Sequence, residues 1–169
     1  YTHILPIMLS AAIADLIAEK LNHRPIYASL IVNQVKSAEA KHLSKLFVRD
    51  FMQKTVICFN NGTTLQEAQE KLSEFNHKTF PVKNDRNKLL GLITKADIED
   101  AIFQGVNGNI EINRLMNPSP ITIEPSENLY IAYFRLHSNN AKCLVVTDKN
   151  NKIKGILTRE DINEALNCN

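Results

Sequence analysis

Apolar and polar residues alternate along this chain in two patterns, and each pattern occurs twice between residue 47 and the C-terminus. In one pattern, two short apolar runs flank a polar turn, which predicts a β-hairpin. In the other, apolar residues recur every three or four positions, which is typical of a helix with one buried face. The predicted hairpins are 79–93, with its turn at 84–87, and 143–157, with its turn at 148–151.

A short apolar strand and a helix precede each predicted hairpin, and a closing helix follows it. The expected first strands are Thr55–Cys58 and Ile121–Ile123. Thr64 and Glu67 have the spacing of a capping box, in which each side chain bonds the other residue's backbone amide at the start of a helix. The helices before the hairpins are expected to bury Leu65, Ala68, Leu72 and Phe75 in one copy, and Leu129, Ala132, Tyr133 and Leu136 in the other.

The two copies form an internal repeat with a constant offset of 64 residues and no gap. The matching pairs include Met52 and Met116, Leu65 and Leu129, Val82 and Val146, Gly91 and Gly155, Thr94 and Thr158, and Asp97 and Asp161. One copy alone has about 55–60 residues, which is marginal for a hydrophobic core. We therefore predict an α/β (α+β) fold in which the order β-α-β-β-α occurs twice and two sheets pack together across a pseudo-twofold axis.

The residues best suited to bind a ligand follow the second strand of each hairpin. Gly91, Thr94 and Asp97 have the spacing Gly-x-x-Thr-x-x-Asp, and the same motif recurs 64 residues later. Free amides and the dipole at the mouth of a helix favour an anion such as phosphate. The Thr hydroxyl can donate to a phosphate oxygen, the Asp carboxylate can accept from ribose hydroxyls, and Lys95 or Arg159 can add positive charge.

The same spacing is also that of an ordinary helix cap. A Thr at the N-cap accepts a hydrogen bond from the amide three residues later, and an acidic residue in the first turn favours the helix dipole. Both roles are compatible, because an empty site can cap itself. The recurrence of Gly, Thr and Asp after both hairpins favours a ligand site.

This tandem unit with its Gly-x-x-Thr-x-x-Asp ending resembles a pair of CBS domains, also called a Bateman module, over about residues 47–167. Members of that family commonly bind adenine nucleotides in clefts between the two repeats, so the resemblance implies ATP, ADP or AMP as a regulatory ligand. It implies two candidate clefts, of which it favours the first. The first combines Thr158, Arg159 and Asp161 with Thr55, Val56 and Ile57, and the second combines Thr94 and Asp97 with Pro120 and Ile121.

A strongly apolar segment, Ile4–Leu21, precedes the repeats and carries two acidic residues, Asp15 and Glu19. Its length is close to the lower limit for crossing a bilayer, which takes roughly 20 residues. On composition alone it fits an amphipathic helix of a soluble protein as well as it fits a membrane span. Residues 26–46 have the pattern of a linker helix.

The segment from Tyr1 to Pro6, the apolar helix, and then Arg24–Tyr27 together resemble the last pore helix and exit segment of CLC-type chloride channels and transporters. This resemblance implies that Tyr1 lies at the chloride pathway and that an upstream membrane domain belongs to the same chain. It also implies a multi-pass membrane homodimer whose C-terminal part is cytoplasmic. The alternative is a nucleotide-binding CBS module of another transporter or enzyme. The expected divisions are 1–25 for the pore helix, 26–46 for the linker, and 47–106 and 107–169 for the repeats.

Composition and motifs narrow the remaining function classes. The net charge of +2 and the lack of a dense basic run argue against nucleic-acid binding. Cys58, Cys143 and Cys168 are widely spaced and read as free thiols. The five His residues are scattered, so we expect neither a metal site nor a catalytic centre, and we interpret the chain as a non-enzymatic module.

Overall fold

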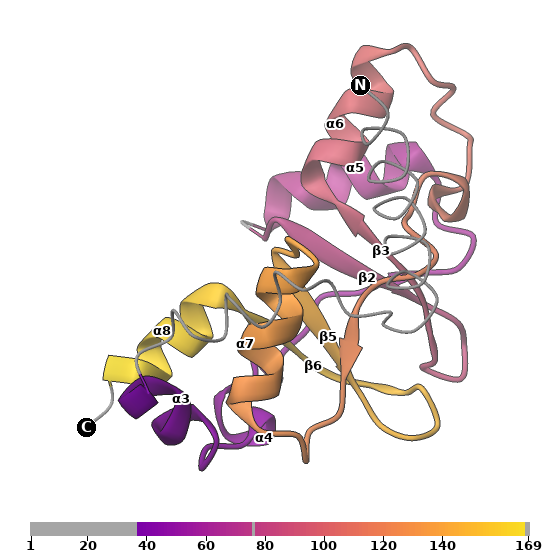
Figure 1. The fold of residues 1–169 in the computed structure, drawn as a ribbon. Coiled ribbons are helices and arrows are strands. Elements are labelled where there is room, and N and C mark those ends of the chain that lie inside the picture. The colour runs from indigo at the N-terminus through magenta and orange to yellow at the C-terminus, as the bar shows by residue number, and fades with distance from the viewer. Residues whose placement is uncertain (1–36, 76, 168–169) are drawn as a thin grey trace, which may run out of the picture. The chain divides into compact units, whose positions relative to one another are not determined.

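The computed structural model describes residues 37–75 and 77–167 (Figure 1). Two helices come first, α3 (Ser37–Leu43) and α4 (Val48–Phe51). The first repeat then contains β1 (Phe59–Asn60), α5 (Leu65–Glu74), β2 (Thr79–Lys83), β3 (Leu89–Thr94) and α6 (Lys95–Phe103). A short 3₁₀ helix (Ile112–Arg114) leads to the second repeat, which contains β4 (Thr122–Ile123), α7 (Leu129–Ser138), β5 (Cys143–Thr147), β6 (Ile153–Thr158) and α8 (Arg159–Asn167).

Each repeat has one three-stranded sheet, with the orders β1-β2-β3 and β4-β5-β6. In both, the first strand is parallel to the second, and the second and third form an antiparallel hairpin. The predicted hairpin turns are confirmed. The carboxyl of Asp148 accepts hydrogen bonds from the amides of Asn150 and Lys152, both at 2.9 Å, and Asn151 completes the turn at φ 60°. Asn tolerates this left-handed conformation better than most residues.

The capping box of α5 is also confirmed. Thr64 Oγ1 accepts from the amide of Glu67 at 3.3 Å, and Glu67 Oε2 accepts from the amide of Thr64 at 2.9 Å.

The expected strand Thr55–Cys58 is wrong, because the first sheet takes Phe59 and Asn60 as its edge strand instead. Phe59 is fully buried, and its ring lies 5.1 Å from the ring of Phe80, so burial of this aromatic residue fixes the register. Residues 54–58 connect the first sheet to a backbone pairing that Gln53 makes with the other repeat.

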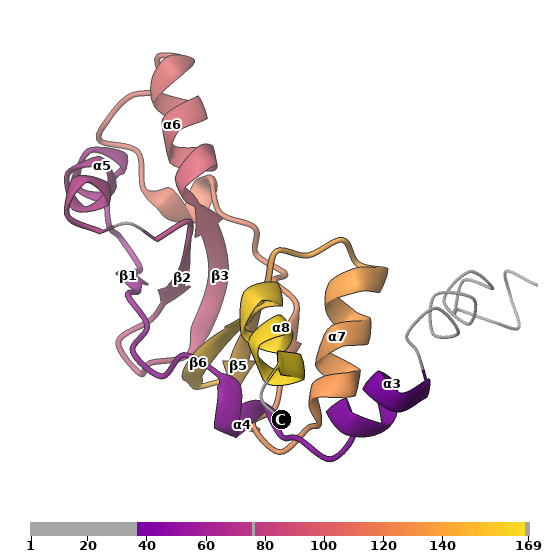
Figure 2. The same ribbon diagram turned by 90° about the vertical axis from the view of Figure 1, so that its left-hand side faces the viewer.

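The segment in front of each repeat packs against the other repeat. Leu43 and Val48 are fully buried in one core with Leu129 and Leu144 of the second repeat. In return, Ile112 lies fully buried in the core of the first repeat. Figures 1 and 2 show this exchange, with the indigo α3 and α4 beside α7 and α8. The sequence divisions 47–106 and 107–169 therefore describe the repeat in the chain. In space, each half also contains the segment in front of the other repeat, here called a lead segment: residues 43–53 for the first repeat and 110–117 for the second.

Equivalent residues of the two repeats meet along a pseudo-twofold axis. Lys88 pairs with Lys152, and Cys143 Sγ lies 3.7 Å from Thr79 Oγ1; both pairs are 64 residues apart. A small apolar cluster between the sheets contains the buried residues Leu89, Val145 and Ile153. The predicted contact between the sheets is thus present, and it adds a small shared cluster to the core that each half has of its own.

The predicted helix 4–21, Tyr1 and most of the linker 26–46 lie outside the described residues. The end of the linker that is described contains α3, which stops at Leu43. None of the helices within 37–75 and 77–167 combines the length and the apolar character that a bilayer span requires.

Candidate functional site

The first helix entrance lies where β3 meets α6. Thr94 Oγ1 accepts from the amide of Asp97 at 3.1 Å, and Asp97 Oδ2 accepts from the amide of Thr94 at 2.8 Å. The cap that we considered at this motif is therefore present. Asp97 remains exposed to solvent. Lys95, which follows Thr94 in the chain, is paired with Glu99 at 3.7 Å across one turn of α6, an exposed contact that is weak in water.

The second helix entrance lies where β6 meets α8. Asp161 Oδ2 accepts from the amide of Thr158 at 2.7 Å and from its hydroxyl at 2.8 Å. Asp161 Oδ1 accepts a third hydrogen bond, at 3.0 Å, from the side-chain amide of Gln53. Gln53 stands in the lead segment of the first repeat, 108 residues earlier in the chain.

The lead segments explain the glycine at the start of each motif. The backbone of Gln53 pairs with Ile156, with N–O distances of 2.9 and 3.0 Å, and that of Asn117 pairs with Leu92 at 2.9 and 2.8 Å. A Cβ on Gly155 would lie 2.8 Å from the carbonyl oxygen of Gln53. Glycine is needed here because another backbone passes at close range.

The residues that each predicted cleft takes from the other repeat follow these pairings in the chain. Thr55 is two residues beyond Gln53, and Val56 and Ile57 follow it, both partly buried. Pro120 is three residues beyond Asn117, and Ile121 is fixed by a hydrogen bond from the Val145 amide to its carbonyl at 3.1 Å. The assignment of these residues to a ligand stays a prediction. Sequence reasoning missed Gln53 and Asn117.

Arg159 has a different immediate role from the phosphate contact that we expected. Its guanidinium donates to the carbonyl oxygens of Ala141 at 3.2 Å and Leu136 at 3.4 Å, and to Asn140 Oδ1 at 3.4 Å. These acceptors lie at the C-terminal end of α7, where helix carbonyls lack partners within the helix. These contacts use Nε and Nη2, so a phosphate contact through Nη1 would leave them in place.

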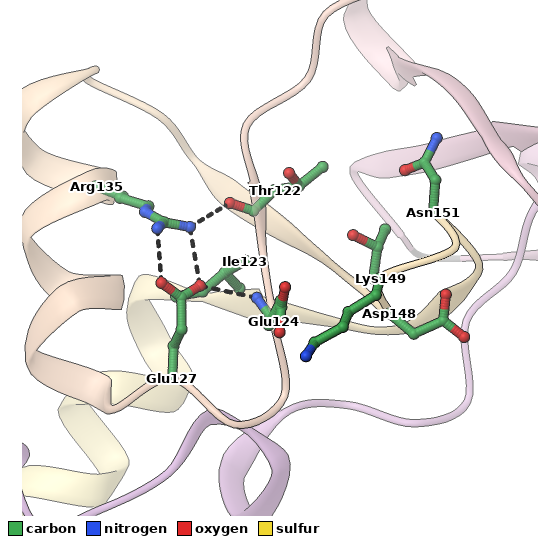
Figure 3. Close-up of a pocket in the computed structure, with 9 residues that line it drawn as sticks. Thr122, Ile123, Glu124, Glu127, Arg135, Asp148, Lys149 and Asn151 are labelled. Carbon is green, nitrogen blue, oxygen red and sulfur yellow. Dashed lines mark hydrogen bonds and ion pairs between the residues drawn. The ribbon is translucent and has the colours of Figure 1, made fainter.

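A separate polar hollow of about 550 Å³ lies at the opposite end of the β4-β5-β6 sheet from Thr158 (Figure 3). In it, Arg135 donates to both carboxylate oxygens of Glu127, at 2.7 and 3.0 Å, and to the carbonyl of Thr122 at 2.8 Å. The pKa of Asp148 at its rim is lowered, chiefly by the hydrogen bond from the Lys152 amide. The charged groups of Arg135, Glu127 and Asp148 thus already have partners within the protein: the first two pair with each other, and Asp148 binds its own turn. No cluster of three or more His, Cys, Asp or Glu suited to a metal occurs in the described part of the chain.

The repeated geometry corresponds to a known family. Residues 48–104 and 111–167 each match the model of the CBS domain. The chain belongs to the CBS domain family. Its two matched segments are the two repeats. Each helix entrance described above lies at the start of the last helix of a CBS domain.

Solved structures of other CBS pairs have the same fold. CBSX2, crystallised in complex with AMP, is 28% identical and has a TM-score of 0.64, and the match covers 71% of this chain and 95% of that one. The CBS domain pair of protein MJ0100, in complex with 5′-methylthioadenosine and S-adenosyl-L-methionine, is 26% identical with a TM-score of 0.63. That match covers 72% of this chain and 95% of the other.

Curated relatives are longer proteins of which one part is similar to this chain. An L-aspartate semialdehyde sulfurtransferase of Methanosarcina acetivorans is 25% identical over 91% of this chain and 31% of its own length. The uncharacterised protein YtoI of Bacillus subtilis is 26% identical over 96% of this chain and 34% of its own. The chain thus spans about a third of the length of these relatives.

Proposed function

We propose that this CBS pair is a regulatory module that binds an adenosine-containing ligand at its helix entrances. The observation that carries the proposal is the duplicated entrance, in which a Thr hydroxyl and an Asp carboxylate stand at the N-terminal ends of α6 and α8. The role is regulatory rather than catalytic.

The ligand class follows from what is shared among the ligands of similar CBS pairs. AMP, 5′-methylthioadenosine and S-adenosylmethionine are the ligands named for two pairs of 26–28% identity. They have adenosine in common, whereas only AMP carries a phosphate. A carboxylate that accepts from ribose hydroxyls suits all three, and the helix amides add a contact for the phosphate of AMP, ADP or ATP. Asp97 and Asp161 are therefore the residues on which binding most depends.

Thermal unfolding with and without ligand tests this proposal. A ligand at 100 times its Kd should raise the free energy of unfolding by about 2.7 kcal/mol, which is a readily measured rise in Tm. The double variant Asp97→Asn/Asp161→Asn should lose most of that rise. Asp100→Asn, an equal change at an exposed position of α6, is the matched control. If AMP, ADP, ATP, 5′-methylthioadenosine and S-adenosylmethionine all leave the Tm of the unmodified chain unchanged, the proposal is wrong.

For the protein that carries the pair, the resemblance of residues 1–27 to the last helix of CLC proteins favours a chloride channel or chloride/proton antiporter. In that assignment Tyr1 contacts chloride, the protein is a multi-pass membrane homodimer, and the CBS pair lies in the cytosol. The alternative is a CBS module of another transporter or an enzyme. Two observations favour this alternative. One relative described above has an enzyme name. The YtoI match covers 96% of the chain and so extends into residues 1–36, the part on which the resemblance to CLC proteins rests.

Chloride efflux from liposomes that contain the whole protein separates the two assignments. A chloride flux that adenosine ligands alter, and that Asp97→Asn/Asp161→Asn makes insensitive to them, is the result expected for a CLC-type protein. Ligand binding without any chloride flux favours the alternative.

A further inference from the structure

The two helix entrances differ in the hydrogen bonding of their aspartates. Both oxygens of Asp161 are occupied, Oδ2 by Thr158 and Oδ1 by the side-chain amide of Gln53 at 3.0 Å. Asp97 uses only Oδ2, which accepts from the Thr94 amide at 2.8 Å. Within 37–75 and 77–167, Asp97 Oδ1 accepts no hydrogen bond and faces solvent. A carboxylate oxygen that accepts no other hydrogen bond is therefore available to a ribose hydroxyl in the Thr94–Asp97 entrance only.

The difference arises from a single side chain at equivalent positions of the repeat. Gln53 and Asn117 are 64 residues apart, and their backbones make the same two hydrogen bonds to the last strand of the other repeat. The shorter Asn117 turns back on its own loop, where Oδ1 accepts from the Ser119 amide at 2.9 Å. Gln53 has one more methylene group, and its amide reaches across to Asp161. The backbone pairing is thus the same at the two entrances, and the longer side chain of Gln53 adds a hydrogen bond to Asp161 that Asn117 does not make to Asp97.

We propose that Gln53 is a latch on the Thr158–Asp161 entrance: a ligand whose ribose bonds to Asp161 must first displace the Gln53 amide. Among the residues that the structure describes, none forms an equivalent latch on the Thr94–Asp97 entrance, and that entrance fills at lower ligand concentration. This inference rests on the proposed function, because it describes the order in which the two entrances bind the same adenosine ligand. It reverses the preference for the Thr158–Asp161 cleft that the family resemblance implies.

Titration calorimetry with AMP and with S-adenosylmethionine tests the latch, one entrance at a time. Asp97→Asn leaves the Thr158–Asp161 entrance as the site to be measured, and Asp161→Asn leaves the other. Adding Gln53→Asn, which gives the first repeat the shorter side chain of the second, should tighten binding in the Asp97→Asn background by about three- to tenfold. That range corresponds to the net worth of one hydrogen bond to a carboxylate at a solvent-accessible position.

Matched controls separate the latch from general effects of the substitution. In the Asp161→Asn background, Gln53→Asn should leave the Kd unchanged, because that entrance does not contact Gln53. Gln53→Leu keeps the size of the side chain without its amide, and it should tighten binding as Gln53→Asn does if the hydrogen bond is responsible. All these changes keep the backbone pairing of Gln53 with Ile156, so the melting temperatures should stay close to one another.

The possible negative results distinguish a failure of the latch from a failure of the proposed function. Equal Kd values with and without Gln53 in the Asp97→Asn background overturn the latch and leave the proposed function in place. Tighter binding at the Thr158–Asp161 entrance than at the Thr94–Asp97 entrance in the otherwise unmodified pair also overturns it. An absence of binding in the unmodified chain overturns the proposed function, and the latch with it.

Discussion

At the scale of single residues, Arg159 links the end of one helix to the start of another. It is the first residue of α8, and its guanidinium binds carbonyl oxygens at the end of α7. His137 lies in the last turn of α7, with its ring 4.2 Å from the ring of Tyr133. Partial burial and, to a lesser extent, the positive charge of Arg159 lower the pKa of His137 from its ordinary value.

The substitution Arg159→Gln should therefore raise the pKa of His137, although only part of the way, because burial is the larger cause. The titration of the His137 ring protons by NMR measures this directly. Arg86→Gln removes an equal charge from an exposed turn of the first repeat and should leave the His137 titration where it is. An unchanged midpoint in Arg159→Gln would contradict the assigned electrostatic contact.

The lowered pKa also determines how His137 affects stability. The unfolded chain binds the proton more readily, since its His pKa is about 6.5. The contribution of His137 to the free energy of unfolding is therefore present above that pH and is lost as the pH falls through the lower, folded pKa.

At the scale of elements, the pairing of each lead segment with the last strand of the other repeat depends on a glycine. A Cβ on Gly155 would meet backbone oxygen at 2.8 Å, and one on Gly91 would meet the carbonyl oxygen of Asn117 at 2.7 Å. Backbone cannot rotate away as a flexible side chain can, so the lead segment itself must shift.

Gly155→Ala and Gly91→Ala should each lower the free energy of unfolding by about 1–3 kcal/mol, the usual cost of forcing an extra carbon into a packed site. Urea denaturation curves give this value. Gly108→Ala is the matched control, because its added Cβ would lie 3.4 Å from Gln66 Cβ, an ordinary contact. A loss for Gly108→Ala as large as that for Gly155→Ala would count against this explanation.

The elements that could be predicted from sequence are those that local chemistry determines. The hairpins follow from apolar runs around Asn- and Asp-containing turns, and the α5 cap follows from the spacing of Thr64 and Glu67. The expected strand at 55–58 failed because a short apolar run does not indicate which neighbour its backbone will pair with. In this chain the pairing partner of Gln53 is in the other repeat, a relation that one repeat read alone does not contain.

The residues of the candidate site likewise fall into those that could be predicted from the sequence and those that could not. Thr94, Asp97, Thr158 and Asp161 were found because the motif recurs at a constant offset, and the caps that they form are local. The bond between Gln53 and Asp161 joins residues 108 positions apart and depends on one side-chain length. A comparison of position 53 with position 117 reveals that the two residues differ. It does not reveal which of them reaches an aspartate.

At the scale of the whole molecule, the exchange of lead segments means that neither repeat is complete as the sequence delimits it. A fragment of residues 47–106 contains Val48 without the core that buries it, and it lacks Ile112. A fragment of residues 54–117 contains Ile112 and omits Val48. A fully buried Ile contributes about 1.5–3 kcal/mol, a large share of the stability of so small a unit.

We expect fragment 54–117 to unfold more cooperatively, and at a higher temperature, than fragment 47–106. Circular dichroism melts of the two fragments beside the whole chain provide the comparison. Should fragment 47–106 prove the more stable of the two, the lead segments would contribute less to the cores than their burial indicates.

The same exchange determines which CBS domain receives a force applied to the N-terminal end of the chain. Leu43 and Val48 anchor the incoming segment in the second CBS domain, although the first domain comes next in the sequence. Tension from residues before Ser37 therefore loads the second domain ahead of the first. Gln53 extends from that anchored stretch to Asp161, so tension would act on the side chain that, in the proposed latch, a ligand must displace.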